Sequence, residues 1–402
     1  MNVVSPEEVG FSTDRLGRIT EMMQGYVDEG KLAGAVTMLA REGEIFHFEP
    51  VGLADIETNR PMEKDSIFRI YSMTKPITSV AVMMLYEEGH FSLDDPVGRF
   101  IPELGRMKVY DGMGERGMRL VDQEKPITIR HLLMHTAGLS YGNYQDSPVE
   151  ELYRQVDIME PDSSLLDMVK KLSGLPLLTQ PGERWRYSRA TDVLGYLVEV
   201  VSGQPFDQFL QERIIGPLGM VDTAFYVSEE KLDRLATVYG PKADGSIEAL
   251  DNPFVNRFRE PHKLFSGGGG LTSTAADYMR FSQMLSNEGE LDGVRLLGPK
   301  TVQLMTSNHL PEELKPFAVG QSMASGTRGC GFGLGFSVVM DIAEHGILGS
   351  EGIYSWGGAA STIFWVDPVE DLVAILLAQM MPSSTYPLRR QFQVAAYQAL
   401  IS

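Results

Sequence analysis

The chain has 402 residues, 43% of them hydrophobic and 22% charged, a composition typical of a globular protein large enough for two domains. Its formal net charge of −19 argues against nucleic acid and against an anionic membrane surface as partners, because both bind basic surfaces. The single cysteine, Cys330, excludes an internal disulfide and has no His or Cys partner at metal-ligand spacing. We therefore expect a small buried residue at this position and no metal.

Residues 1–10 contain Glu7 and Glu8 and no apolar run, which is unlike a signal peptide or an anchor. No segment approaches the roughly 20 unbroken apolar residues of a membrane span. We therefore expect a cytoplasmic protein whose partner is a small molecule. The oligomeric state is left open between a monomer and a homodimer.

The first quarter of the chain combines helical and strand patterns. Apolar residues recur at helical spacing over residues 12–29. Residues 34–41 and 44–49 indicate two strands joined as a hairpin, and residues 52–59 indicate a third short strand. The apolar run within residues 72–89 predicts a buried helix.

Beyond residue 95, turns and helices replace the strands. Residues 105–117 are charged, rich in glycine and without clear periodicity, which predicts an exposed loop. Whether the segment 105–125 covers a cleft is left open. Helical patterns follow at residues 129–135, 163–172 and 190–202.

Four consecutive glycines, residues 267–270, precede a helix that we predict for residues 275–287 with Thr274 as its N-cap. The run lacks the frames of phosphate-binding and dinucleotide-binding loops. We therefore expect close backbone approach or the wall of a substrate cleft here, and no cofactor.

The last quarter returns to strands before a final helix. The strand patterns cover residues 333–339, 353–358, 361–366 and 372–378, and the helical pattern covers residues 388–401. Strands at both ends with helices between them predict one antiparallel sheet built from both termini and flanked by helices. We accordingly expect an α/β domain from residues 1–95 and 260–402, a mostly helical inserted domain from residues 96–259, and an active site in the cleft between them.

Ser72 and Lys75 stand three residues apart at the start of the buried helix, so they share one face. A serine hydroxyl needs a neighbour that takes its proton, and a lysine can do so only when its pKa falls from about 10 toward about 7. Pro76 agrees with the first helical turn, where a nitrogen has no carbonyl partner. The motif predicts a nucleophile and its base. The alternative is an N-cap serine followed by a surface lysine.

A second candidate nucleophile is Ser140, in the G-x-S-x-G match of residues 138–142. The nucleophile elbow of α/β-hydrolases lies between a strand and a helix, whereas here a helical pattern precedes and a polar loop follows. His131 and His135 lie nearby in sequence. We keep the elbow as an alternative.

Two further segments complete a constellation with Ser72-Met73-Thr74-Lys75. Tyr187-Ser188 follows the turn Pro181-Gly182-Glu183, and Trp356-Gly357-Gly358 lies on a late strand. In this order and with these separations, the chain resembles the family VIII carboxylesterases, the esterase relatives of class C β-lactamases. The resemblance covers nearly the whole chain and implies a serine β-lactamase-like fold and a serine carboxylesterase that acts on esters with small to medium acyl chains.

The resemblance also implies roles for individual residues. Ser72 matches the acylated nucleophile, Lys75 its activator, and Tyr187 the group that relays a proton to the leaving group. We expect Lys75 and Tyr187 to lower each other's pKa. The backbone N–H groups of Ser72 and Ala359 match the oxyanion hole. The substrate-binding positions are Trp356, Gly357 and Gly358.

Two departures bear on the substrate. Arg189 stands where β-lactamases carry an asparagine, and Trp356 replaces the cation that binds a substrate carboxylate. Both departures favour neutral esters over β-lactams, and we expect Arg189 to pair with Asp192 on its own helix face. The alternatives are a β-lactamase, D-peptidase, amidase or acyltransferase that uses the same Ser-Lys-Tyr site, and a binding protein that has kept the fold without catalysis.

Overall fold

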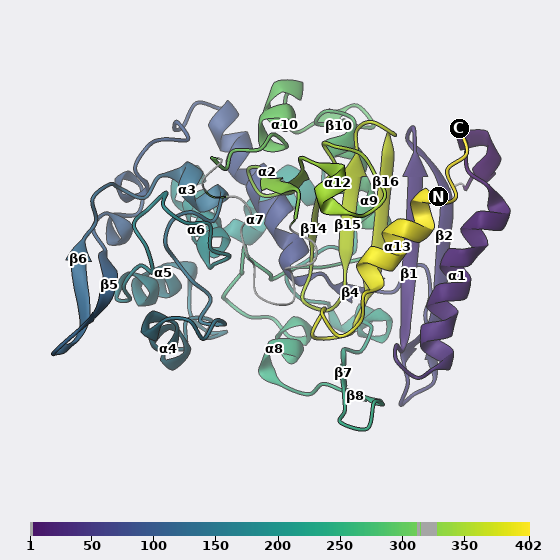
Figure 1. The fold of residues 1–402 in the computed structure, drawn as a ribbon, viewed down its shortest axis with the longest axis horizontal. Coiled ribbons are helices and arrows are strands. Elements are labelled where there is room, and N and C mark those ends of the chain that lie inside the picture. The colour runs from purple at the N-terminus through teal and green to yellow at the C-terminus, as the bar shows by residue number, and fades with distance from the viewer. Residues whose placement is uncertain (1–2, 312–313, 315–327) are drawn as a thin grey trace.

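The computed structural model describes residues 3–311, 314 and 328–402 of the chain (Figure 1). Within these residues, eight strands form one sheet in the order β12-β13-β14-β15-β16-β1-β2-β3, and every neighbouring pair is antiparallel. The N-terminal strand β1 (Gly34–Arg41) pairs along its length with the C-terminal strand β16 (Leu372–Ala378). This pairing confirms the prediction of one antiparallel sheet built from both termini.

The remaining strands of the large sheet are β2 (Glu44–Asp55), β3 (Arg60–Pro61), β12 (Cys330–Phe332), β13 (Ser337–Val339), β14 (Tyr354–Gly357) and β15 (Ile363–Asp367). Small two-stranded pairs are formed by β4 (Phe68–Arg69) with β9 (Thr272–Ser273), β7 (Tyr239–Pro241) with β8 (Ile247–Ala249), and β10 (Glu290–Leu291) with β11 (Val294–Arg295).

Both faces of the large sheet are covered by helices, and the strands show it in their sequence. α1 (Thr13–Asp28) and α13 (Leu388–Tyr397) pack on one face, and α9 (Ala275–Ser286) packs on the other (Figure 1). Along β16, alternate side chains enter two different hydrophobic clusters, and all seven residues are buried. This explains why β16 is a continuous apolar run rather than an alternating one.

α2 (Thr74–Glu87) lies between the sheet and the helical part of the molecule, where it packs against α6 (Ala190–Ser202). Residues 74–85 of α2 are all buried. A helix that is apolar on every side can only be a central helix. The N-terminal end of α2, which carries the Ser-x-x-Lys motif, is therefore held in the interior.

The other α-helices are shorter and lie mainly around α2 and α6. They are α3 (Ile129–Leu133), α4 (Pro148–Gln155), α5 (Leu165–Ser173), α7 (Phe206–Leu210), α8 (Pro253–Asn256), α10 (Pro299–Met305) and α12 (Ile342–His345). Among the described residues, every helix is too short or too polar to span a bilayer.

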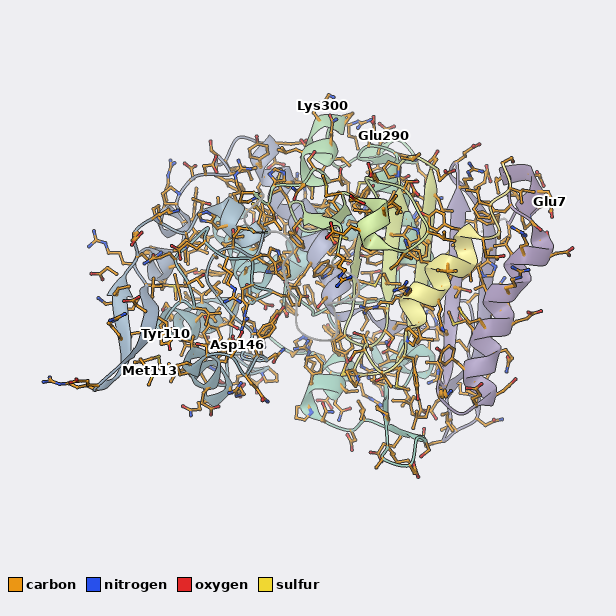
Figure 2. The ribbon with its side chains drawn as sticks, viewed as in Figure 1. Glu7, Tyr110, Met113, Asp146, Glu290 and Lys300 are labelled. Atoms are coloured by element: carbon orange, nitrogen blue, oxygen red, sulfur yellow. The ribbon has the colours of Figure 1, made fainter. Side chains whose placement is uncertain are left out.

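The stretch expected to be a loop at residues 105–117 is instead a hairpin of β5 (Lys108–Gly114) and β6 (Gly117–Asp122). The hairpin projects from the body, and Met113 near its tip is 65% exposed (Figure 2). A register shift between Tyr110 and Met113 breaks the alternation by which a strand is recognised in sequence. The prediction of a loop was therefore wrong.

Two strand boundaries also differ from the prediction. The segment 52–59 is not a separate strand, because β2 continues to Asp55. The segment 333–339 contains a tight turn in which the Gly333 N–H donates to the Phe336 carbonyl at 2.8 Å. Gly335 in this turn has φ +103°, a conformation that favours glycine. Strand pairing therefore begins again only at β13.

Candidate active site

Ser72 lies in a 3-10 turn, Tyr71–Met73, directly before α2. Tyr71 has φ +43°, which is strained for a residue with a side chain. Its buried ring stacks on Phe254 at 5.0 Å between centroids and contacts the edge of Phe258 at 5.4 Å. Aromatic packing thus holds the backbone of the turn, and the Ser72 hydroxyl precedes the helix instead of belonging to its first α-helical turn.

Lys75 is 1% exposed, and its ammonium group has three acceptors. Nζ donates to Ser72 Oγ at 3.2 Å, to Tyr141 Oη at 2.8 Å and to the Gly268 carbonyl at 2.5 Å. Three acceptors use all the donors of an ammonium group and fix its direction. The alternative of a surface lysine is excluded.

Burial lowers the pKa of Lys75 from 10.5 to about 7, because the charged form loses its hydration. The negative charge of Asp192 opposes this shift, and the positive charge of Arg189 adds to it. An amine with a pKa near 7 is available as a general base at neutral pH. The condition set by the Ser72-x-x-Lys75 motif is therefore met in the structure.

Tyr187 joins this pair from a distant loop. Its ring centroid lies 4.5 Å from Lys75 Nζ, and its hydroxyl accepts a hydrogen bond from Trp356 Nε1 at 3.4 Å. Burial raises the pKa of Tyr187, although hydrogen bonding to Ser72 and to Trp356 works in the opposite direction. The expectation that Tyr187 has a lowered pKa was wrong, because desolvation of the phenolate dominates. Tyr187 is a neutral phenol at pH 7, ready to donate a proton.

Sequence reasoning missed Tyr141, whose hydroxyl accepts the 2.8 Å hydrogen bond from Lys75. Its ring lies 5.1 Å from the ring of Tyr187, and the Arg189 guanidinium stands 4.6 Å from its centroid. Burial raises the pKa of Tyr141 well above its usual value. Tyr141 is therefore a neutral positioning residue for the amine. The available signal was its place beside Ser140, within the segment that we examined as an elbow.

Ser140 itself is fully buried and donates a hydrogen bond to the Glu150 carboxylate. His135 contacts the Ser188 hydroxyl, with Nδ1 and Oγ 3.3 Å apart. Burial lowers the pKa of His135 well below its usual value. The structure gives Ser140 a carboxylate partner and no strand before it, so the elbow hypothesis is not supported.

The end of β14 approaches the nucleophile closely, and its glycines make this possible. A Cβ on Gly358 would lie 2.3 Å from the Ile70 carbonyl, and a Cβ on Gly357 would lie 2.7 Å from Arg389 Cζ. Ala359 follows and packs in the same hydrophobic cluster as Tyr71.

The backbone N–H groups of Ser72 and Ala359 are the candidates for an oxyanion hole. Within the described part of the chain, no acceptor takes the N–H of Ser72 or of Ala359. Two unpaired N–H groups on neighbouring turns can bind the oxygen of a tetrahedral intermediate.

The glycine run shows the close backbone approach that the sequence predicted as one of two uses. A Cβ on Gly267 would lie 2.6 Å from the Thr191 carbonyl. Asp192 accepts hydrogen bonds from the Gly268 N–H at 2.9 Å and from the Ser266 hydroxyl. The ion pair between Arg189 and Asp192 is confirmed, with Nη1 and Oδ2 3.7 Å apart. One residue, Gly268, thus connects the Asp192 carboxylate to Lys75 through its N–H and its carbonyl.

Cys330 is buried, as predicted, and burial raises the pKa of its thiol to about 11. No cluster of three or more His, Cys, Asp or Glu side chains in the described ranges is arranged to hold a metal ion.

Replacing Tyr141 with phenylalanine removes one acceptor from Lys75 and leaves the ring in place. We expect kcat to fall about 10- to 100-fold, because a hydrogen bond to a charged group contributes about 1.5–3 kcal/mol. The Lys75 ammonium also loses stabilisation, so the acidic limb of the pH profile should move to lower pH. Steady-state kinetics from pH 5 to 9 measure both effects.

The matched control is Tyr144→Phe, in the same loop, where the ring packs under the Arg186 guanidinium at 3.6 Å. It should change neither kcat nor the pH profile. An unchanged kcat and pH profile in Tyr141→Phe would contradict the positioning role.

The fold and the site define a class of protein. Serine hydrolases that form an acyl-enzyme need a serine hydroxyl beside a base, a proton donor and N–H groups for the oxyanion. The described residues supply Ser72, the buried amine of lowered pKa, a neutral phenol and two unpaired N–H groups. The Beta-lactamase family profile matches residues 19–398. The chain belongs to the Beta-lactamase family, as a serine hydrolase of the esterase type.

Three similar proteins place it within that family. Protein Rv1367c of Mycobacterium tuberculosis is 39% identical over 368 residues, 88% of each chain. Esterase EstB of Burkholderia gladioli is 32% identical over 402 residues, 94% of each chain. The structure of "EstCE1, a hydrolase with promiscuous acyltransferase activity" has a TM-score of 0.79 and 29% identity, covering 97% of this chain and 99% of that one. The sequence-based resemblance to family VIII carboxylesterases is confirmed.

Proposed function

We propose that the protein is a serine carboxylesterase that hydrolyses esters with small to medium acyl chains. The observation that carries this proposal is the 3.2 Å contact between Lys75 Nζ and Ser72 Oγ, made by a buried amine whose pKa burial lowers to about 7. The similarity to esterase EstB supports an ester as the substrate. The substrate enters between the sheet-containing part, residues 1–95 and 260–402, and the helical part, residues 96–259.

In the proposed reaction, neutral Lys75 takes the proton of Ser72, and Oγ forms a bond with the ester carbonyl carbon. The N–H groups of Ser72 and Ala359 bind the resulting oxyanion. Tyr187 gives its proton to the leaving alcohol oxygen as that C–O bond breaks, and it recovers a proton from the Lys75 ammonium. A water molecule then attacks the acyl-enzyme with the same groups acting in reverse, which releases the acid.

The test is labelling with a fluorophosphonate together with a series of p-nitrophenyl esters from acetate to octanoate. We expect one adduct, on the peptide that contains Ser72, and the highest kcat/KM among the shorter esters. An adduct on Ser140 would favour the elbow, and a folded protein that takes no label and hydrolyses no ester would favour a binding protein.

Acyl transfer to an alcohol is the second candidate, favoured by the similarity to EstCE1, a hydrolase with promiscuous acyltransferase activity. The acyl-enzyme would be the same, and the acceptor would be an alcohol in place of water. Transfer to an added alcohol that outruns hydrolysis would establish this function. Turnover of nitrocefin would instead indicate a β-lactamase.

A further inference from the structure

Two arginines lie near Lys75, although the protein as a whole is strongly acidic. The Arg189 guanidinium lies over the Tyr141 ring, whose hydroxyl accepts from Lys75. Arg257 Nη2 donates to the carbonyl of Gly269 at 3.0 Å, one residue beyond the carbonyl that accepts from Lys75. Positive charge is therefore concentrated where the substrate must bind.

Among the residues that the structure describes, most hydrogen-bond donors of these two arginines have no acceptor. Arg257 makes one hydrogen bond there, and Arg189 makes the 3.7 Å ion pair with Asp192. In both side chains Nε is buried without a partner among the described residues. Elsewhere in the molecule Arg186 makes three hydrogen bonds and Arg234 makes four.

The Asp192 carboxylate pairs with Arg189 and supplies one negative charge against the two arginines, so it offsets part of their positive charge. Asp192 is fully buried, and its Oδ1 already accepts from Ser266 and Gly268. Burial lowers the pKa of Lys75 and of Arg257; the positive charge of Arg189 adds to both shifts, and the negative charge of Asp192 opposes them. Cations close together in a partly desolvated site are costly unless an anion joins them. Guanidinium groups bind carboxylates well, because their donors match the two oxygens.

We propose that the physiological substrate is an ester that also carries a free carboxylate, which Arg257 and Arg189 bind beside Lys75. This inference rests on the proposed function, since it names the substrate class of the same site. It replaces the sequence-based preference for neutral esters, which considered Trp356 and the pairing of Arg189 but not the distant Arg257.

The experiment compares isosteric pairs of esters that differ only in charge. 3-Acetoxybenzoate is compared with 3-acetoxybenzamide, and 4-nitrophenyl adipate monoester with 4-nitrophenyl adipamate. The first pair carries the carboxylate on the alcohol and the second carries it on the acyl chain. In one of the two pairs we expect a kcat/KM for the acid at least 10-fold higher than for the amide. This preference should come mainly from a lower KM, and 0.5 M NaCl should reduce it.

In Arg257→Gln the ratio of kcat/KM for acid over amide should fall at least 5-fold. The matched control is Arg259→Gln, an exposed arginine two residues away, which should keep the wild-type ratio. If Arg257→Gln does not fold, two measurements on the wild type replace it. The proposal requires that salt lower the acid-over-amide ratio and that 3-hydroxybenzoate inhibit more strongly than 3-hydroxybenzamide.

Each failure has its own signature. Hydrolysis of the amides without preference for either acid would overturn the carboxylate site and leave the esterase intact. An unchanged ratio of kcat/KM for acid over amide in Arg257→Gln would mean that Arg257 only holds the Gly269 carbonyl, and it would overturn the proposed binding role. Hydrolysis of none of the four esters would count against the proposed function itself.

Discussion

Ser72→Ala should lower kcat/KM for p-nitrophenyl esters by about 10⁴-fold or more, because Ser72 is the only serine or threonine whose hydroxyl contacts Lys75 Nζ in the described part of the chain. Removing a nucleophile that works as one unit with its base removes nearly the whole effect of both groups. Tyr141 is the other hydroxyl within reach of the amine, but burial raises the pKa of its phenol and makes it a poor nucleophile. Initial rates with p-nitrophenyl acetate measure the loss.

The comparison variant is Ser140→Ala, which tests the alternative nucleophile. It removes the hydrogen bond to the buried Glu150 carboxylate, so we expect a loss of about 1–3 kcal/mol in the free energy of unfolding. The purified variant should still take the fluorophosphonate label and hydrolyse esters. Near-normal activity in Ser72→Ala combined with loss of labelling in Ser140→Ala would reverse the assignment of the nucleophile.

The parts of the site that could be predicted from sequence are those set by local geometry. Lys75 lies in the first turn of a helix whose residues 74–85 are all buried, and Ser72 precedes it by three residues, so the burial of the amine and its proximity to Ser72 could be predicted from the local sequence. The sheet could be predicted for a similar reason, because β1 and β16 are apolar runs with clear turns at their ends. Tyr187 required the family resemblance, since no local pattern brings residue 187 to residue 72.

The parts that were missed depend on contacts between distant segments. Ser140 and Tyr141 are adjacent in one glycine-rich loop. Only the fold shows that the Tyr141 phenol contacts Lys75 and that the Ser140 hydroxyl contacts Glu150 instead. Arg257 reaches the site through the carbonyl of Gly269, and nothing in its own segment marks it. The pKa of Tyr187 was misjudged because spacing predicts neighbouring charges but not the depth of burial, which dominates here.

Lys75→Met should lower kcat by about 10²- to 10⁴-fold, the usual contribution of a general base. In the wild-type protein only the neutral amine can take the Ser72 proton, and burial lowers its pKa to about 7. The rate should therefore rise with pH through about 7 and then level off. Lys75→Met should lose this limb, because methionine fills the same space without a titrating group. A retained limb would assign the titration to another residue.

The same pKa shift determines how stability depends on pH. Between about pH 7 and 10.5 the Lys75 amine is neutral in the folded protein and protonated in the unfolded chain. The unfolded state thus binds more protons, so the cost of burying this group falls and the free energy of unfolding rises with pH, by at most about 1.4 kcal/mol per pH unit. Near pH 7 the burial of the amine is costly, and the hydrogen bonds to Tyr141 and Gly268 partly offset that cost.

Denaturant unfolding at pH 7, 8 and 9 measures this directly. The free energy of unfolding of the wild type minus that of Lys75→Met should increase with pH, because the shared titrations of all other groups cancel. Lys300→Met on α10, whose exposed amine hydrogen-bonds to Gln303, should show the same pH dependence of unfolding as the wild type (Figure 2). A difference that stays constant between pH 7 and 9 would mean that the pKa of Lys75 is close to its ordinary value, and the amine could not then act as the base for Ser72.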